Sequence, residues 1–137
     1  MAVLVLDTEA VSALARPHQD LERHQRVRAA LRSAHRRNSP VRIPSAVLVE
    51  LYRGRGTDEV VDGVLARGFA QVVTTGVRMA RIAGHLLADA HVGSELAIAA
   101  LVVATAVRLG GGVIATHDPD DLRLLATRHP NVSILDI

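Results

Sequence analysis

Short segments that are apolar throughout alternate along this chain with longer segments of helical periodicity, and this alternation is its strongest constraint on the fold. Residues 3–6 (VLVL) and 113–115 (VIA) are the clearest apolar segments, and shorter ones lie at 41–43, 71–73 and 132–135. Strands without polar alternation are typical of a parallel sheet that is covered on both faces, because neither side of such a strand meets water. The sequence therefore predicts an α/β fold with a mostly parallel central sheet.

Helices are predicted between these strands from apolar spacing and from residues that cap or break helices. Thr8 is expected to cap a helix that extends to about residue 14, where Arg16 and Pro17 break it. Further helices are predicted at residues 21–37, 45–53, 59–66, 76–90, 94–107 and 119–127. Because no linker, repeat or low-complexity tract interrupts the pattern, we expect a single domain over residues 1–137.

The composition excludes several classes of site. The chain has 137 residues, 49% of them hydrophobic, and no cysteine, so disulfides, zinc–thiolate centres and thiol nucleophiles are ruled out. Its first residues lack the basic segment of a signal peptide. The longest apolar stretch, residues 96–107, is shorter than the roughly 18 residues of a membrane span. We therefore expect a cytoplasmic protein with no membrane partner.

Acidic residues occupy the ends of the apolar segments. Asp7 follows residues 3–6, Glu50 follows 46–49, and Asp118 follows 112–117. In parallel sheets, sites form beyond the carboxyl ends of the strands, so Asp7 and Asp118 are predicted to lie there. Carboxylates that share such a place raise one another's pKa, and a hard divalent cation such as Mg²⁺ or Mn²⁺ relieves the repulsion. The pattern indicates an acidic metal site suited to phosphodiester chemistry.

Structural roles for these acids remain open at this point. Asp7 is also placed to cap the helix that follows it, and Glu50 is spaced to form an ion pair with Arg53 three residues later. Asp118 and Asp120 flank Pro119 in a pattern that also suits an ordinary helix start. This last role is compatible with metal binding.

All 16 basic residues are arginines, whose guanidinium groups pair bidentately with phosphates and carboxylates. The net charge is only +2, so any affinity for nucleic acid must come from local patches. One such run spans residues 23–37 and is either a solvated helix face, an RNA-backbone track or a docking face for an acidic partner. Arg53 and Arg55 follow Glu50 closely and are further candidates for contacting a scissile strand.

Four segments, in this order and spacing, resemble the motifs of a known family. They are residues 5–14 (VLDTEAVSAL), 44–54 (PSAVLVELYRG), 99–106 (AALVVATA) and 115–122 (ATHDPDDL). Together they resemble PIN-domain ribonucleases, and specifically the VapC-type toxins of type II toxin–antitoxin systems. The resemblance extends over essentially the whole chain.

The resemblance implies a PIN-like three-layer α/β/α fold and Mg²⁺-dependent endonucleolytic cleavage of cellular RNA, with Mn²⁺ as a possible substitute. It also implies a homodimer and a cognate antitoxin that blocks the site. By this resemblance the metal ligands would be Asp7, Glu50 and Asp118, assisted by Asp120, with Thr116 as a polar residue beside them. Asp121 is so close in register that its role is not separable from that of Asp120.

The chain departs from the family at Ala99, a position where the third motif usually opens with aspartate. Losing one acid of a metal-binding cluster is expected to weaken catalysis strongly. Three explanations remain open: an introduced substitution that disarms a toxic nuclease, a naturally non-cleaving member, or compensation by Glu95. In a continuous α-helix Glu95 would lie on the same face as Ala99.

Two rival functions remain. One is a catalytically silent binding module that acts through complex formation with an antitoxin. The other is a phosphatase-like hydrolase with Asp7 as its nucleophile, which would need a second aspartate at position 9, where this chain has Glu9.

Overall fold

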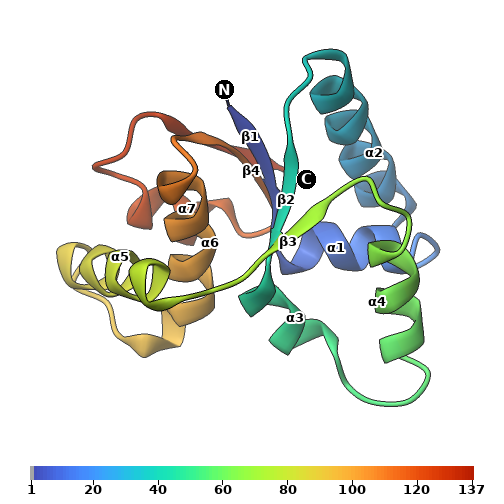
Figure 1. The fold of residues 1–137 in the computed structure, drawn as a ribbon, viewed down its shortest axis with the longest axis horizontal. Helices are drawn as coiled ribbons and strands as arrows, with labels where there is room; N and C mark the ends of the chain where they lie inside the picture. The colour runs from blue at the N-terminus through green and yellow to red at the C-terminus, as the bar shows by residue number, and fades with distance from the viewer. Residues whose placement is uncertain (1) are drawn as a thin grey trace.

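The computed structural model describes residues 2–137 and contains a five-stranded sheet (Figure 1). Its strands are β1 (Val3–Leu6), β2 (Val41–Pro44), β3 (Gln71–Val73), β4 (Gly112–Thr116) and β5 (Val132–Asp136). Their order across the sheet is β3-β2-β1-β4-β5, and every neighbouring pair is parallel. The prediction of a mostly parallel sheet is confirmed.

Helices form a layer on each side of the sheet (Figure 1). One layer contains α1 (Thr8–Ala15), α2 (Leu21–Arg36) and α4 (Asp58–Leu65), and the other contains α5 (Val77–Asp89), α6 (Ala97–Arg108) and α7 (Pro119–Leu125). The short helix α3 (Ser45–Leu51) lies beyond the carboxyl end of β2, at the lower edge of the sheet in Figure 1. The predicted three-layer α/β/α arrangement is therefore confirmed.

The core covers both faces of the central strands, with α6 on one face and α1, α2 and α4 on the other. Val5 and Leu6 of β1 and Ile114 of β4 are completely buried, as the unbroken apolar segments predict. Helix α6 contributes small side chains to this core, including Ala100 and Ala104, which allow the helix to approach the sheet closely. An apolar helix buried on most of its surface positions its amino end rigidly beside the carboxyl ends of β1 and β4.

The pairing of β1 with β4 depends on Gly112. A Cβ atom at this residue would overlap the backbone of Val3, its register partner. The register continues to the pair Leu6 and Ala115, so both strands end at the same level. Asp7 and Thr116 therefore follow the last paired residues of adjacent strands.

Three predicted helix boundaries were wrong. The cap of α1 is Asp7 and not Thr8: Asp7 is extended, and its Oδ1 accepts a hydrogen bond of 3.0 Å from the amide of Ala10. Helix α3 ends at Leu51, because Tyr52 is already extended. The helix predicted at residues 94–107 is divided into a 3₁₀ turn, η1 (Ser94–Leu96), and α6. Within the described residues no helix is both long enough and apolar enough to cross a bilayer.

Candidate active site

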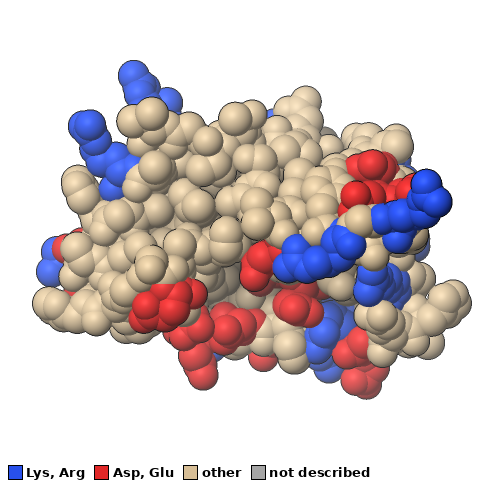
Figure 2. Space-filling model, turned by 90° about the horizontal axis from the view of Figure 1, so that it is seen from below, with Lys and Arg blue, Asp and Glu red and all other residues tan. Residues whose placement is uncertain are grey.

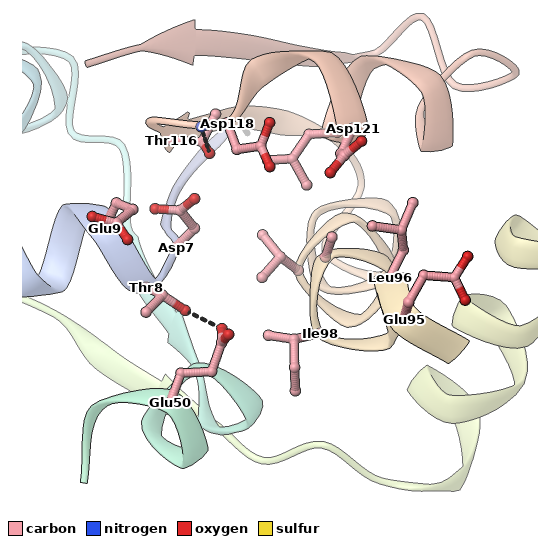
Figure 3. Close-up of a pocket in the computed structure, with 13 residues that line it drawn as sticks. Asp7, Thr8, Glu9, Glu50, Glu95, Leu96, Ile98, Thr116, Asp118 and Asp121 are labelled. Carbon is pink, nitrogen blue, oxygen red and sulfur yellow. Dashed lines mark hydrogen bonds between the residues drawn. The ribbon is translucent and has the colours of Figure 1, made fainter. Parts of the chain in front are cut away.

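A cavity of about 330 Å³ opens at the carboxyl edge of the sheet, between α1, α3, α6 and α7 (Figure 3). Its acidic lining residues are Asp7, Glu9, Glu50, Glu95, Asp118 and Asp121. Seen from this edge, acidic side chains surround a hollow near the middle of the molecule (Figure 2). The structure thus brings the three predicted ligands Asp7, Glu50 and Asp118 together at one cavity, with Ala99 in the same lining.

Asp7 is the most deeply placed acid of the cavity. Desolvation by burial raises its pKa from 3.8 to about 6, although hydrogen bonds from the Thr116 hydroxyl and the Ala10 amide act in the opposite direction. Asp7 therefore serves both as a helix cap and as a cavity-lining carboxylate, and the two roles do not compete. A carboxylate that is hard to ionise in the free protein is one that a bound cation would stabilise.

Asp118 and Asp121 form a second acidic group, on the side of Asp7 opposite Glu50 (Figure 3). Desolvation raises the pKa of Asp118, and hydrogen bonding and charge repulsion from Asp121 raise it further. The Asp118 amide donates a 3.0 Å hydrogen bond to the hydroxyl oxygen of Thr116, which is fully buried. Thr116 thus fixes the turn that directs Asp118 towards the cavity.

The structure separates the two neighbouring acids of α7. Asp121 lines the cavity, whereas Asp120 is outside the lining and lies 3.8 Å from the guanidinium of Arg123. The Asp120 side chain is 94% exposed. The helix begins at Pro119, and consecutive helical side chains point about 100° apart, so only one of the two acids can face the site.

Glu50 reaches the cavity from α3 and is held there by α1. The Thr8 hydroxyl donates a 2.6 Å hydrogen bond to Oε1 of Glu50 (Figure 3). The alternative ion pair with Arg53 does not form, because the Arg53 guanidinium donates instead to the carbonyl oxygens of Val49 and Tyr52, at 2.6 and 2.8 Å. Thr8 is therefore a positioning residue for Glu50.

The wall formed by α6 is apolar, with Leu96, Ile98, Ala99 and Val102 facing the cavity. Glu95 does not supply the missing acid in this structure. Its carboxylate accepts a 3.1 Å hydrogen bond from the Gly93 amide at the start of η1, and Figure 3 shows it directed away from Asp7. The 3₁₀ turn causes this difference, because it rotates Glu95 off the helical face that carries Ala99.

The donor chemistry of the cavity suits a hard divalent cation, because all the candidate ligands are carboxylate or hydroxyl oxygens. The pKa values of Asp7 and Asp118 are raised chiefly by desolvation, and for Asp118 also by Asp121, so a bound cation would favour the ionised carboxylates. These carboxylates line one cavity, but they are farther apart than the ligands of a single bound ion. Across residues 2–137 no three acidic or histidine side chains lie close enough together to form a ready coordination shell.

A second cavity of about 180 Å³ adjoins the first and shares Thr8, Glu9 and Glu50 with it. Its lining adds Arg16 and Arg53. Basic side chains accordingly lie beside the acidic hollow on the side of α1 and α4 (Figure 2). Acidic and basic groups are therefore adjacent at this edge, an arrangement that suits a phosphate group next to a metal-binding centre.

The sequence matches the PIN domain family over residues 4–127. This chain belongs to the PIN domain family. No curated protein sequence matches it. Among solved structures, it is similar to a chain of VapBC2 from Rickettsia felis bound to a DNA fragment from its promoter, with a TM-score of 0.62, 16% identity and 98% of each chain covered. It is also similar to DNA-bound VapBC from Salmonella typhimurium, with a TM-score of 0.62, 20% identity, and 99% and 98% coverage of the two chains.

The sequence pattern does not identify site roles for Thr8 and Arg16, and it names Asp121 without separating its role from that of Asp120. Thr8 was assigned to helix capping, and its partner Glu50 lies 42 residues away, so only the fold brings the two together. Asp121 was not separated from Asp120, because a shift of one residue in the helix start would exchange their directions. The presence of Pro119 at the first helical position was the one available signal.

Proposed function

We propose that this chain is a VapC-type toxin scaffold, a PIN-domain endoribonuclease that cleaves cellular RNA and is neutralised by a cognate antitoxin. The observation that carries the proposal is that Asp7, Glu50 and Asp118 line one cavity in a chain of the PIN family. The likeness to VapBC complexes over nearly the full chain supports the toxin assignment. A homodimer in the cytoplasm is the corresponding proposal for assembly and location.

Asp7 and Asp118, with Glu50 held by Thr8, are the residues that would hold Mg²⁺ or Mn²⁺. Such an ion supplies Lewis-acid stabilisation of charge on a phosphodiester and lowers the pKa of water. Asp121, and not Asp120, would be the acid that assists these ligands, because Asp121 lines the cavity. Arg16 and Arg53, in the adjoining cavity, are placed to contact phosphates beside the scissile one.

Ala99 is the reason to propose that the activity of this chain is much reduced. Its methyl group lines the cavity where the family's third motif usually provides an acid, and Glu95 is hydrogen-bonded elsewhere. The three proposed ligands come from the end of β1, from α3 and from the β4–α7 turn, and on the α6 side Glu95, the acid in the lining, is hydrogen-bonded to the Gly93 amide. An ion that lacks one of its carboxylate ligands is expected to bind weakly and to be poorly positioned for catalysis.

The test is a paired cleavage assay of this chain and its Ala99→Asp variant on a panel of structured RNAs, with Mg²⁺ and with chelator. We expect metal-dependent cleavage by the variant that exceeds that of the parent chain by about 100-fold. Ala99→Asn is the matched control, because it has a similar size without the charge. Equal cleavage by the variant and this control would refute a role for the missing carboxylate.

A second candidate is a catalytically silent PIN module that acts through complex formation alone. The observation in its favour is that the described residues contain no ready cluster of three ligands. Under this alternative, Ala99→Asp would acquire metal binding without acquiring cleavage of any RNA in the panel. Calorimetry with Mn²⁺ on the same two proteins establishes whether the variant binds metal, and the cleavage assay then separates the two candidates.

A further inference from the structure

Helix α2 and the residue after it carry the highest concentration of positive charge along the chain. Residues 21–37 include six arginines and one glutamate, a net charge of +5, whereas the whole chain has a net charge of +2. The remaining residues are therefore net negative. Any polyanion that binds this protein through long-range attraction is directed to this helix and to the few arginines near the cavity.

Three of these arginines form a regular row. Arg28, Arg32 and Arg36 follow one another at intervals of four residues and are all exposed. Within the part of the chain that the structure describes, none of the three forms an ion pair, whereas Arg23 pairs with Glu9 and Asp20, and Arg26 pairs with Glu22. Like charges four residues apart on a helix oppose helix formation slightly, so intrahelical stability does not account for the row.

The helix leads away from the cavity. At its amino end, the Arg23 guanidinium lies 3.5 Å from the carboxylate of Glu9, which lines the cavity. Figure 1 shows α2 extending from α1, near the carboxyl edge, towards the opposite edge of the sheet. The 13 residue steps from Arg23 to Arg36 correspond to about 20 Å along the helix axis. The arginine row lies about 140° to 220° around the helix axis from Arg23, on the solvent-facing side of α2, so it is a surface separate from the cavity.

The chemistry of this face favours a sugar–phosphate backbone over an acidic peptide. A peptide ligand is normally anchored by apolar side chains in a groove, and the exposed face of α2 offers only Leu21, at its first residue, as a large apolar group. With no aromatic side chain on the helix, base stacking is also excluded. Evenly spaced guanidinium groups without base-reading neighbours match phosphates.

We propose that Arg28, Arg32 and Arg36, the arginine row of α2, bind the phosphate backbone of the RNA on the solvent-facing side of the helix, outside the cavity at the carboxyl edge. The row contributes affinity without base specificity. The inference rests on the proposed function for the identity of the nucleic acid, and it adds a substrate-binding surface outside the acidic cavity.

The test is RNA binding measured by fluorescence anisotropy in chelator, with a labelled stem–loop RNA of about 20 nucleotides. The Arg28→Gln/Arg32→Gln/Arg36→Gln variant is expected to bind about tenfold or more weakly than the parent at about 100 mM salt. Its plot of log affinity against log salt should be shallower by about two to three, because each lost phosphate contact lowers the slope by about 0.9 in a duplex.

The chain offers a matched control. Arg78, Arg81 and Arg108 line one shallow cavity on the α5–α6 side, are exposed, and have no ion-pair partner among residues 2–137. Replacing all three by glutamine removes the same charge elsewhere, and we expect a change in RNA affinity of about twofold or less. Equal weakening by both triple variants would overturn the proposal, because the effect would then be one of net charge alone.

A second variant distinguishes the loss of charge from a loss of folded structure. Arg28→Lys/Arg32→Lys/Arg36→Lys keeps the charge, and it should keep the salt slope of the parent. If it loses binding as completely as the glutamine variant does, backbone electrostatics are not the cause and the proposal fails. Thermal unfolding of each variant, followed by circular dichroism, is measured alongside.

Poly-glutamate is the second probe. Suppose that poly-glutamate binds the parent and binds the glutamine variant of the row more weakly, whereas both proteins bind RNA equally. The row would then be a surface for an acidic partner, and the RNA proposal would be overturned. Because these measurements are made without metal, their outcome is independent of cleavage. RNA binding that depends on the row, combined with failure of Ala99→Asp to cleave, would refute the nuclease proposal and leave this one standing.

Discussion

The two walls of the cavity differ sharply. The wall formed by the ends of β1 and β4 is acidic and firmly positioned, with Asp7 capping α1 and Asp118 fixed by Thr116. The opposite wall, at the amino end of α6, is apolar and contains Ala99. The acidic wall is held by local structure that does not depend on residue 99, because Asp7 accepts from the Ala10 amide and the Asp118 amide donates to Thr116.

The largest expected effect comes from disrupting the acidic wall in a chain whose α6 wall has been restored. In an Ala99→Asp background, Asp7→Asn should reduce metal-dependent RNA cleavage by about 1000-fold or more, because it removes the most deeply placed ligand. Single-turnover cleavage in Mg²⁺ measures this effect. Retention of most of the activity would show that Asp7 only caps the helix.

The same substitution should stabilise the free protein at neutral and higher pH. The folded state keeps the proton on Asp7 up to about pH 6, whereas the unfolded state releases it near pH 3.8, so stability falls as the pH rises through this window. Above it, the penalty is of the order of 3 kcal/mol, from about 1.36 kcal/mol per pKa unit. Asp7→Asn removes the penalty and retains an oxygen that can accept the hydrogen bond from the Ala10 amide.

Urea denaturation in chelator, at pH values below and above this window, checks this prediction. The gain in the free energy of unfolding should be large at high pH and vanish below about pH 4. A gain that is the same at every pH would mean that the pKa of Asp7 is not raised. Asp118→Asn should show a change of the same sign, because the pKa of Asp118 is raised as well.

A smaller effect is expected at the link between α1 and α3. In the Ala99→Asp background, Thr8→Val removes the hydroxyl that donates to Glu50, and cleavage should fall by about tenfold because the carboxylate becomes mobile. Thr8→Ser keeps the hydroxyl and should keep most of the activity. Equal losses in the two variants would assign Thr8 to packing.

The smallest effect is expected at Glu95, on the α6 side of the cavity. Because its carboxylate accepts a hydrogen bond from Gly93, Glu95→Gln should change the affinity of the parent chain for Mn²⁺ by about twofold or less. Calorimetric titration measures this affinity. A loss of about tenfold or more would restore the idea that Glu95 compensates for Ala99.

The sequence predicts the acids of the wall at β1 and β4 and the apolar Ala99 opposite them, but it does not predict the direction of Glu95. Asp7 and Asp118 follow strands that are recognisable by their apolar composition, and parallel strands place their carboxyl ends at one edge. The direction of Glu95 depends on a 3₁₀ turn that interrupts an otherwise continuous helical pattern, and no periodicity in residues 94–107 reveals that turn. Likewise, the exact residue at which α7 begins determines whether Asp120 or Asp121 faces the cavity, and the sequence does not fix that residue.

The central claim is that the acidic wall binds a divalent cation and that Ala99 is the position of its missing ligand. Calorimetric titration of Mn²⁺ into the parent chain, Ala99→Asp and Ala99→Asn tests it most directly, without depending on the choice of RNA. The account predicts that Ala99→Asp binds Mn²⁺ about tenfold or more tightly than the other two, which should bind alike. Equal affinities in all three proteins would contradict it.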